Sequence, residues 1–100
     1  MTKKKILFIV NPIAGKSRNK KIESQILLYL DLEKFIPEIV HTTHKGHASD
    51  LAVQGLQNNV SIIIAVGGDG TINEIIKVIQ NTSCVLGIIP TGSGNGLAYH

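Results

Sequence analysis

Apolar residues fall along this chain in two alternating patterns, short continuous runs and stripes with helical spacing. The runs are typical of strands in a parallel sheet, and we predict strands at residues 6–10, 36–40, 62–66 and 85–89. Between the runs, apolar residues recur at the i, i+3 and i+4 positions of an amphipathic helix. The helical stripes are Ile22, Ile26, Tyr29 and Leu30; Ala48, Leu51, Ala52, Gly55 and Leu56; and Ile72, Ile75, Ile76 and Ile79.

The alternation of strands and helices predicts an α/β fold, a three-layer Rossmann-like parallel sheet with helices on both faces. The run at 36–40 contains Pro37 and Glu38, which favours an edge strand. The other three runs are apolar at nearly every position, so we expect helices to cover them on both faces. In such a sheet the carboxyl ends of the strands share one rim, where open α/β sheets bind ligands.

A glycine-rich segment, Gly-Gly-Asp-Gly-Thr at residues 67–71, lies between the third predicted strand and the third helical stripe. Glycine has no Cβ, so the backbone N–H groups of this segment can approach an anion closely. Thr71 and Glu74 have the spacing of a capping box, which predicts a helix that begins near Thr71. Because a helix N-terminus favours negative charge, we predict a phosphate site here.

Asp69 stands in the middle of this segment. Its carboxylate would repel a phosphate unless a cation lay between them, or unless it took a proton from an attacking hydroxyl. Both roles belong to phosphoryl transfer. A turn aspartate that accepts hydrogen bonds from nearby N–H groups is the structural alternative, but its place on the ligand-binding rim favours a functional role.

Composition narrows the range of functions. One hundred residues with 43% hydrophobic content predict one small domain with its own core. The net charge of +3, with lysines at residues 3–5 and a basic cluster at residues 16–21, suits either a solvated face or an anionic partner. The aromatic residues form no basic-aromatic array, so we expect no nucleic-acid partner. The single cysteine, Cys84, indicates a packed side chain and a reducing cytoplasm.

Two common nucleotide-binding motifs and one metal pattern fail. A P-loop that ends at residues 15–17 would need glycine at position 10, where Val10 stands. A dinucleotide fingerprint at residues 92–97 would need glycine in place of Leu97. Three histidines, His41, His44 and His47, are spaced in a way that could suggest a zinc site. No cysteine or acid completes a recognisable zinc pattern with them, and we therefore expect no direct metal ligand.

Three motifs taken in order resemble the catalytic region of the diacylglycerol kinase and sphingosine kinase superfamily. They are Asn11-Pro12-x-x-Gly15, Gly-Gly-Asp-Gly-Thr-x-Asn-Glu at residues 67–74, and Pro90-x-Gly92-Ser93-x-Asn95. The resemblance runs from about residue 6 to the end of the chain. It implies a fold like the N-terminal domain of 6-phosphofructokinases and NAD kinases, with residues 1–100 as the nucleotide-binding part. A β-rich lipid-binding domain would follow outside this chain, so the isolated residues should be inactive.

The resemblance also implies chemistry, with ATP and Mg²⁺ as cofactors and transfer of the γ-phosphate to a lipid hydroxyl. Asp69 would be catalytic, either as the base or through a water bound to Mg²⁺. The residues that would bind the nucleotide are Asn11, Pro12, Gly15, Thr43, Gly67, Gly68, Gly70, Thr71, Asn73 and Ser93.

The expected partners are ATP and a lipid substrate at a membrane surface, with the protein cytoplasmic and peripheral to the inner membrane face. The sequence leaves open whether the protein forms a homodimer. The acceptor also stays open between diacylglycerol and a sphingoid base, because Gly96 stands where many bacterial diacylglycerol kinases have an acid. An NAD kinase-like enzyme and a non-catalytic nucleotide-binding module are the alternative functions.

Overall fold

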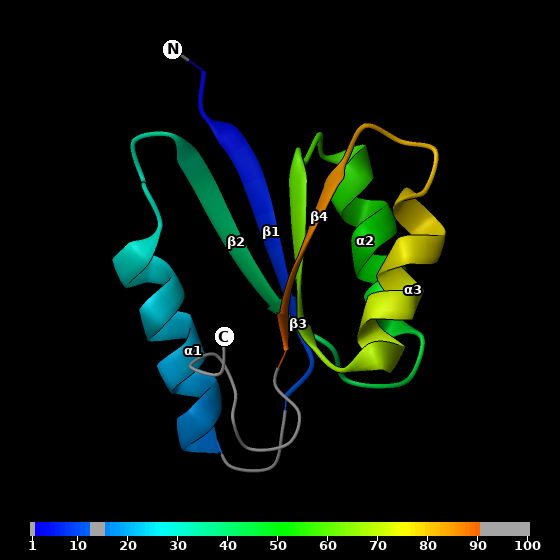
Figure 1. The fold of residues 1–100 in the computed structure, drawn as a ribbon, viewed down its shortest axis with the longest axis horizontal. Coiled ribbons are helices and arrows are strands. Elements are labelled where there is room, and N and C mark those ends of the chain that lie inside the picture. The colour runs from blue at the N-terminus through cyan, green and yellow to red at the C-terminus, as the bar shows by residue number, and fades with distance from the viewer. Residues whose placement is uncertain (1, 13–15, 91–100) are drawn as a thin grey trace.

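Four strands form one parallel sheet with the order β2-β1-β3-β4 in the computed structural model, which describes residues 2–12 and 16–90. Strands and helices alternate along the chain as predicted (Figure 1). The α/β class and the parallel pairing of all neighbouring strands are therefore confirmed. The elements are β1 Lys4–Val10, α1 Lys16–Tyr29, β2 Phe35–His41, α2 His47–Gln57, β3 Ile62–Gly67, α3 Asp69–Ile79 and β4 Val85–Pro90.

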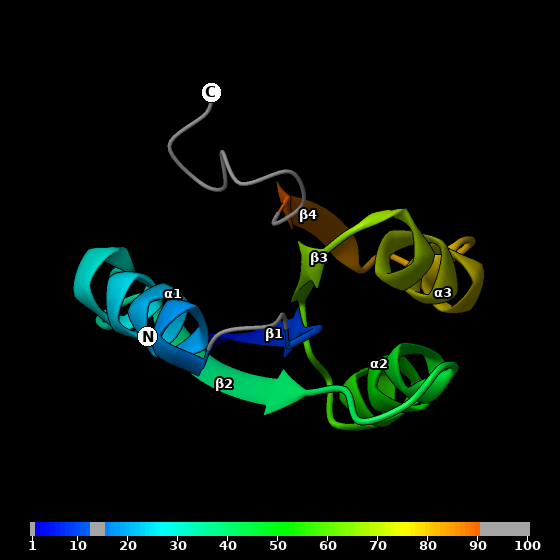
Figure 2. The ribbon, with the colours of Figure 1, turned by 90° about the horizontal axis from the view of Figure 1, so that it is seen from below.

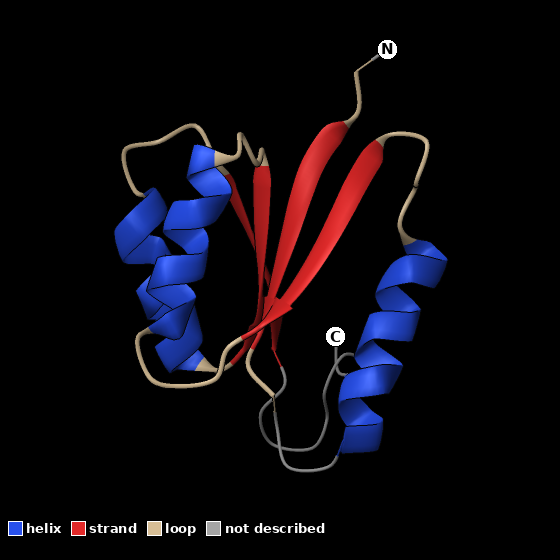
Figure 3. Ribbon diagram, turned by 180° about the vertical axis from the view of Figure 1, so that it is seen from behind, coloured by secondary structure: helices blue, strands red, loops and turns tan. Residues whose placement is uncertain are grey.

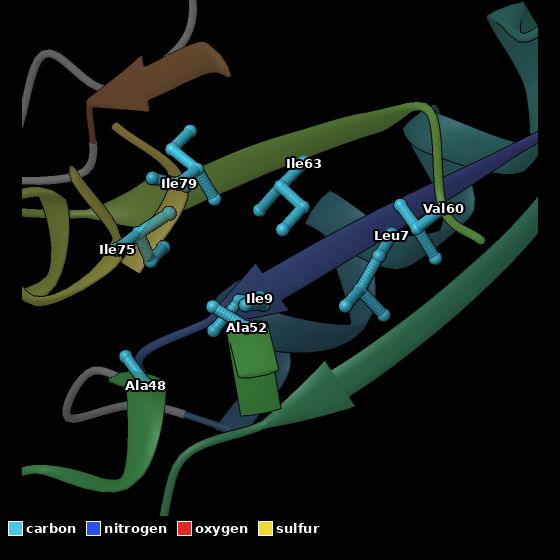
Figure 4. Packing of buried hydrophobic residues seen from close by; sticks show 9 residues of the cluster. Leu7, Ile9, Ala48, Ala52, Val60, Ile63, Ile75 and Ile79 are labelled. Atoms are coloured by element: carbon cyan, nitrogen blue, oxygen red, sulfur yellow. The ribbon is translucent and has the colours of Figure 1, made fainter. Parts of the chain in front are cut away.

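Helices lie on both faces of the sheet, as the sequence predicts. Figures 2 and 3 show α1 on one face and the pair α2 and α3 on the other. Strand β1 serves both layers because successive side chains point to opposite faces. Leu7 and Ile9 belong to the core cluster beneath α2 and α3 (Figure 4), whereas Phe8 packs with Ile22 and Ile26 of α1.

Both edges of the sheet differ from its centre in exposure. Strand β2 is an edge strand, as Pro37 and Glu38 predict. Strand β4 is the other edge, and the expectation that it is covered on both faces is wrong, since Val85 is 59% exposed and Ile88 is 50% exposed. Among the described helices, the one on the α1 face lies over β1 and β2 and does not reach β4 (Figure 2). An apolar run alone does not show which strand has a single neighbour.

Helix α3 begins at Asp69, before the predicted start at Thr71. Gly68 is the N-cap residue in extended conformation, and no side chain caps the helix. The predicted capping box of Thr71 and Glu74 is therefore wrong. With this start, the buried stripe of the helix is centred on Ile75, and Ile76 is 39% exposed; its buried residues are Thr71, Ile75 and Ile79.

Two further side chains test the sequence interpretation. Tyr29, which the helical spacing places with Ile22 and Ile26, is the last residue of α1 and is 80% exposed. Cys84 is partly buried against the core. Burial raises the pKa of its thiol, which favours the neutral form. Cys84 is thus a packed side chain, as predicted.

Candidate active site

The loops that follow β1, β2 and β3 meet at one rim of the sheet. The Asn11 N–H donates to the carbonyl of Val66 at 2.9 Å, and the Thr42 N–H donates to the carbonyl of Val10 at 2.9 Å. The first residues after β1 and β2 therefore continue the strand ladder before the chain turns away. Helices α2 and α3 also begin at this rim (Figure 3).

A cleft of about 550 Å³ opens at this rim. Its size lies within the usual range of small-molecule sites. The structure brings predicted binding residues from three separate loops to this one cleft, as the rim argument requires. The lining residues are Asn11, Pro12, Thr42, Thr43, His44, Lys45, Gly70, Thr71 and Glu74.

The other predicted site residues lie beside the cleft or outside the described residues. Gly67 is buried below it, while Gly68 is exposed at the α3 N-cap. Asp69 and Asn73 are exposed, and their i, i+4 spacing places them on one face of α3. Neither lines the cleft, although Asp69 directly precedes Gly70, which does. Gly15 and Ser93 lie outside the described residues.

The floor of the cleft depends on close packing around Gly67. A Cβ placed on Gly67 would lie 3.1 Å from the Cβ of Asn11 and 3.1 Å from the Oγ1 of Thr71. Glycine at this position therefore lets the loop after β1 approach the first turn of α3. Thr42, which is 9% exposed, donates its hydroxyl to the Asn11 Oδ1 at 3.3 Å. These contacts fix Asn11 between the ends of β2 and β3.

The first turn of α3 presents backbone donors at the cleft. The Ile72 N–H donates to the carbonyl of Gly68 at 3.1 Å and makes the first hydrogen bond of the helix. The N–H groups of Asp69, Gly70 and Thr71 thus have no acceptor within the helix. A Cβ on Gly70 would meet no atom within 4 Å, so the surface at Gly70 is open. Donors that the helix itself does not satisfy, together with the helix dipole, favour an anion at this position.

Histidines shape the segment after β2. The Thr43 N–H donates to the Nδ1 of His47 at 2.9 Å, so this nitrogen carries no proton here. The rings of His44 and His47 stack with centroids 4.6 Å apart. The Nε2 of His41 instead lies 2.7 Å from the Oε2 of Glu23 on α1. Within residues 2–12 and 16–90, no group of three His, Cys, Asp or Glu side chains is placed to hold a metal ion.

Four lining residues lie outside the predicted site, namely Thr42, His44, Lys45 and Glu74. Thr43, which the sequence interpretation placed in the cleft, lines it, and the adjacent Thr42 makes the contact with Asn11. One signal could have marked this wall. Gly46 directly precedes the helical stripe of α2, and its φ of +89° is a left-handed conformation at the N-cap of that helix. A glycine at the end of a strand-to-helix loop is typical of such a turn.

We expect Gly46→Ala to destabilise the protein by about 1–2 kcal/mol, because an L-residue with a side chain is strained in the left-handed region. The cost is conformational, since a Cβ on Gly46 meets nothing within 4 Å. Gly46→Asn is the matched control, because asparagine tolerates positive φ. This chain already places Asn59 and Asn81 there, with φ of 64° and 66°. Denaturant unfolding measures both variants, and equal losses for the two would contradict the strain argument.

Comparison with known proteins places this architecture in a family. Residues 5–100 match the family model described as the diacylglycerol kinase catalytic domain. The chain is 36% identical to a diacylglycerol kinase of Staphylococcus saprophyticus over 98% of its own length and 33% of that protein. It is 36% identical to sphingoid long-chain bases kinase 1 of Arabidopsis thaliana, over 95% of its own length and 14% of that protein.

Solved structures agree with this assignment. A diacylglycerol kinase structure from Bacillus anthracis str. Sterne aligns with a TM-score of 0.63 at 29% identity, over 87% of this chain and 32% of that chain. A second structure from the same organism reaches a TM-score of 0.70 at 33% identity, over 90% of this chain and 32% of that one. The chain thus spans about a third of the length of the bacterial relatives it matches.

Proposed function

We propose, because this chain belongs to the diacylglycerol kinase catalytic domain family, that it is the nucleotide-binding part of an ATP-dependent lipid kinase. The observation that carries the proposal is the first turn of α3, whose N–H groups have no acceptor within the helix and adjoin a cleft of about 550 Å³. Asn11, Thr43, Gly70 and Thr71 converge on this cleft from three loops. Backbone donors at a helix start suit the phosphates of ATP, and the remaining cleft has room for the rest of the nucleotide.

In the proposed reaction, the oxygen of a lipid hydroxyl attacks the γ-phosphorus of ATP. The bond from that phosphorus to the oxygen that bridges to the β-phosphate breaks, and ADP leaves. The hydroxyl proton passes to a base. The donors of α3 hold the phosphates and stabilise the charge on the transferred group, which is the main contribution a protein makes to this reaction.

Asp69 is the proposed catalytic carboxylate among the described residues. Its carboxylate is exposed at the start of α3 and directly precedes Gly70 in the cleft. It would either accept the hydroxyl proton or hold Mg²⁺ through water. A single exposed carboxylate fits Mg²⁺, which in phosphate sites usually keeps several waters and takes one or two carboxylates. Bound Mg²⁺ would neutralise phosphate charge.

The lipid-binding part would lie in the remaining two-thirds of a protein as long as its bacterial relatives. In our proposal a β-rich domain supplies the lipid pocket, and the protein meets its substrate at the cytoplasmic face of a membrane. Among residues 2–12 and 16–90, no helix is long and apolar enough to cross a bilayer. The named relatives include both a diacylglycerol kinase and a sphingoid base kinase, and they support a lipid alcohol as the acceptor class.

The test offers the full-length protein labelled MgATP with diacylglycerol, a sphingoid base or NAD in parallel. We expect label in one of the two lipids, which also identifies the acceptor. Label on NAD alone would overturn the lipid assignment in favour of an NAD kinase-like enzyme. ATP binding without transfer to any acceptor would identify a non-catalytic nucleotide-binding module.

A further inference from the structure

Glu74 has a role in the cleft that its motif does not explain. Its side chain is half-buried on α3, and its Oε2 accepts a hydrogen bond from the backbone N–H of Gly46 at 3.1 Å. Gly46 lies 28 residues earlier in the chain. The carboxylate therefore joins α3 to the segment between β2 and α2.

This contact replaces the missing cap of α2. Gly46 is the N-cap residue of that helix, and no side-chain hydrogen bond caps it. A glycine has no side chain with which to satisfy the free N–H groups of a helix start. Glu74 brings an acceptor from the neighbouring helix to one of these N–H groups, that of Gly46.

A second hydrogen bond strengthens the same joint. The Ser49 hydroxyl, in the first turn of α2, donates to the backbone carbonyl of Glu74 at 3.2 Å. The first turn of α2 is thus bonded to both the side chain and the backbone of one residue of α3. Thr43, His44 and Lys45, which form one wall of the cleft, lie between this joint and the end of β2. We call residues 43–46 the β2–α2 wall.

The β2–α2 wall is therefore held at both of its ends. At one end the Thr43 N–H donates to His47 at 2.9 Å, and at the other the Gly46 N–H donates to Glu74 at 3.1 Å. The hydrogen bond from Gly46 to Glu74 joins the β2–α2 wall to α3, whose first turn would hold the phosphates. It sets the separation between the wall and those phosphate donors.

We propose that Glu74 is a positioning residue that fixes the β2–α2 wall for nucleotide binding through its acceptor oxygen. This inference rests on the proposed function. A carboxylate that faced the phosphates directly would oppose their binding by charge repulsion. The hydrogen bond to Gly46 gives the oxygen a partner in the protein, so what the site needs from residue 74 is an acceptor and not a charge.

The test compares Glu74→Gln with Glu74→Ala in the full-length protein. Glutamine keeps a carbonyl oxygen that can accept from the Gly46 N–H, and alanine removes it. We expect Glu74→Ala to raise KM for ATP about fivefold, the effect of one lost hydrogen bond, with kcat nearly unchanged. Glu74→Gln should leave both constants close to those of the wild type. A fall in kcat for Glu74→Gln would mean that the charge itself acts in the reaction, and would overturn the proposal.

Hydrogen exchange of the Gly46 amide, measured without nucleotide, separates this proposal from the proposed function. The amide should exchange slowly in the wild type and in Glu74→Gln, and faster in Glu74→Ala. Thermal unfolding of each variant checks that the fold is retained. Equal Gly46 exchange in all three proteins would overturn the positioning role even if the enzyme is a lipid kinase. Absence of phosphate transfer by the wild type would instead overturn the proposed function.

Discussion

Asp69→Asn is expected to lower phosphate transfer by the full-length protein by a factor of about 10²–10⁴, the usual contribution of a positioned acid or base. Asparagine preserves the shape of the side chain but accepts a proton poorly and binds Mg²⁺ or its waters weakly. Asp69 is exposed and packs in neither core cluster, so the fold should survive. Transfer of labelled phosphate from ATP to the lipid acceptor gives the rate, and thermal unfolding reports on the fold.

The chain offers a close control in Asp50→Asn. Asp50 is also an exposed aspartate in the first turn of a helix, α2 in its case. Each substitution removes a favourable interaction with a helix dipole of about 0.3–1 kcal/mol. Stability should therefore fall by similar amounts, while activity should fall only for Asp69→Asn. Near-normal transfer by Asp69→Asn would exclude both the base and the Mg²⁺ role. Equal losses of activity in Asp69→Asn and Asp50→Asn would show that only the loss of a negative charge matters, and not the position of Asp69.

Gly70→Ala should have effects of opposite sign on stability and on nucleotide binding. Gly70 is the second residue of α3, and a Cβ there meets no atom within 4 Å. Alanine is the better helix former, by up to about 0.8–1 kcal/mol as in a helix interior, so the nucleotide-free protein should become more stable. Gly70 also lines the cleft. Its new methyl group should keep phosphate away from the N–H groups, and ATP affinity should fall about thirtyfold, roughly the loss of one charge-assisted hydrogen bond.

Calorimetric titration with ATP and denaturant unfolding together measure this pair of effects. The stability measurement serves as the internal control, because it shows that a loss of affinity does not come from damage to the fold. Unchanged ATP affinity would show that phosphate does not approach the backbone at Gly70. A less stable protein would show that the glycine is needed by the free fold and not by the ligand.

The sequence predicts the sheet well because its strands are nearly continuous apolar runs, a pattern that only burial between two layers explains. It does not predict how far each layer extends. Val85 and Ile88 are as apolar as the residues of β3, yet they are half-exposed, since strand order and helix placement decide coverage. Tyr29 fails for a similar reason, because helical spacing gives a direction but not the point where the sheet ends.

The sequence predicts where the site lies better than it predicts which residues contact one another there. Asn11, Pro12, Thr43, Gly70 and Thr71 share the cleft because parallel strands end at one rim. Hydrogen bonds between residues that are distant in the sequence could not be predicted. Glu74 has the local spacing of a capping partner for Thr71, and its carboxylate instead accepts from Gly46, which no local pattern reveals.

The strand order β2-β1-β3-β4 has a consequence for how this site can change. The helix that follows β1 in the chain, α1, lies on one face of the sheet, and the helix that follows the adjacent β3, α3, lies on the opposite face (Figure 2). Neighbouring loops that diverge to opposite faces leave a crevice between them, whatever side chains they bear. The location of the cleft is thus a property of topology. Substitutions in the loops can therefore alter which ligand is held while the place of binding stays fixed.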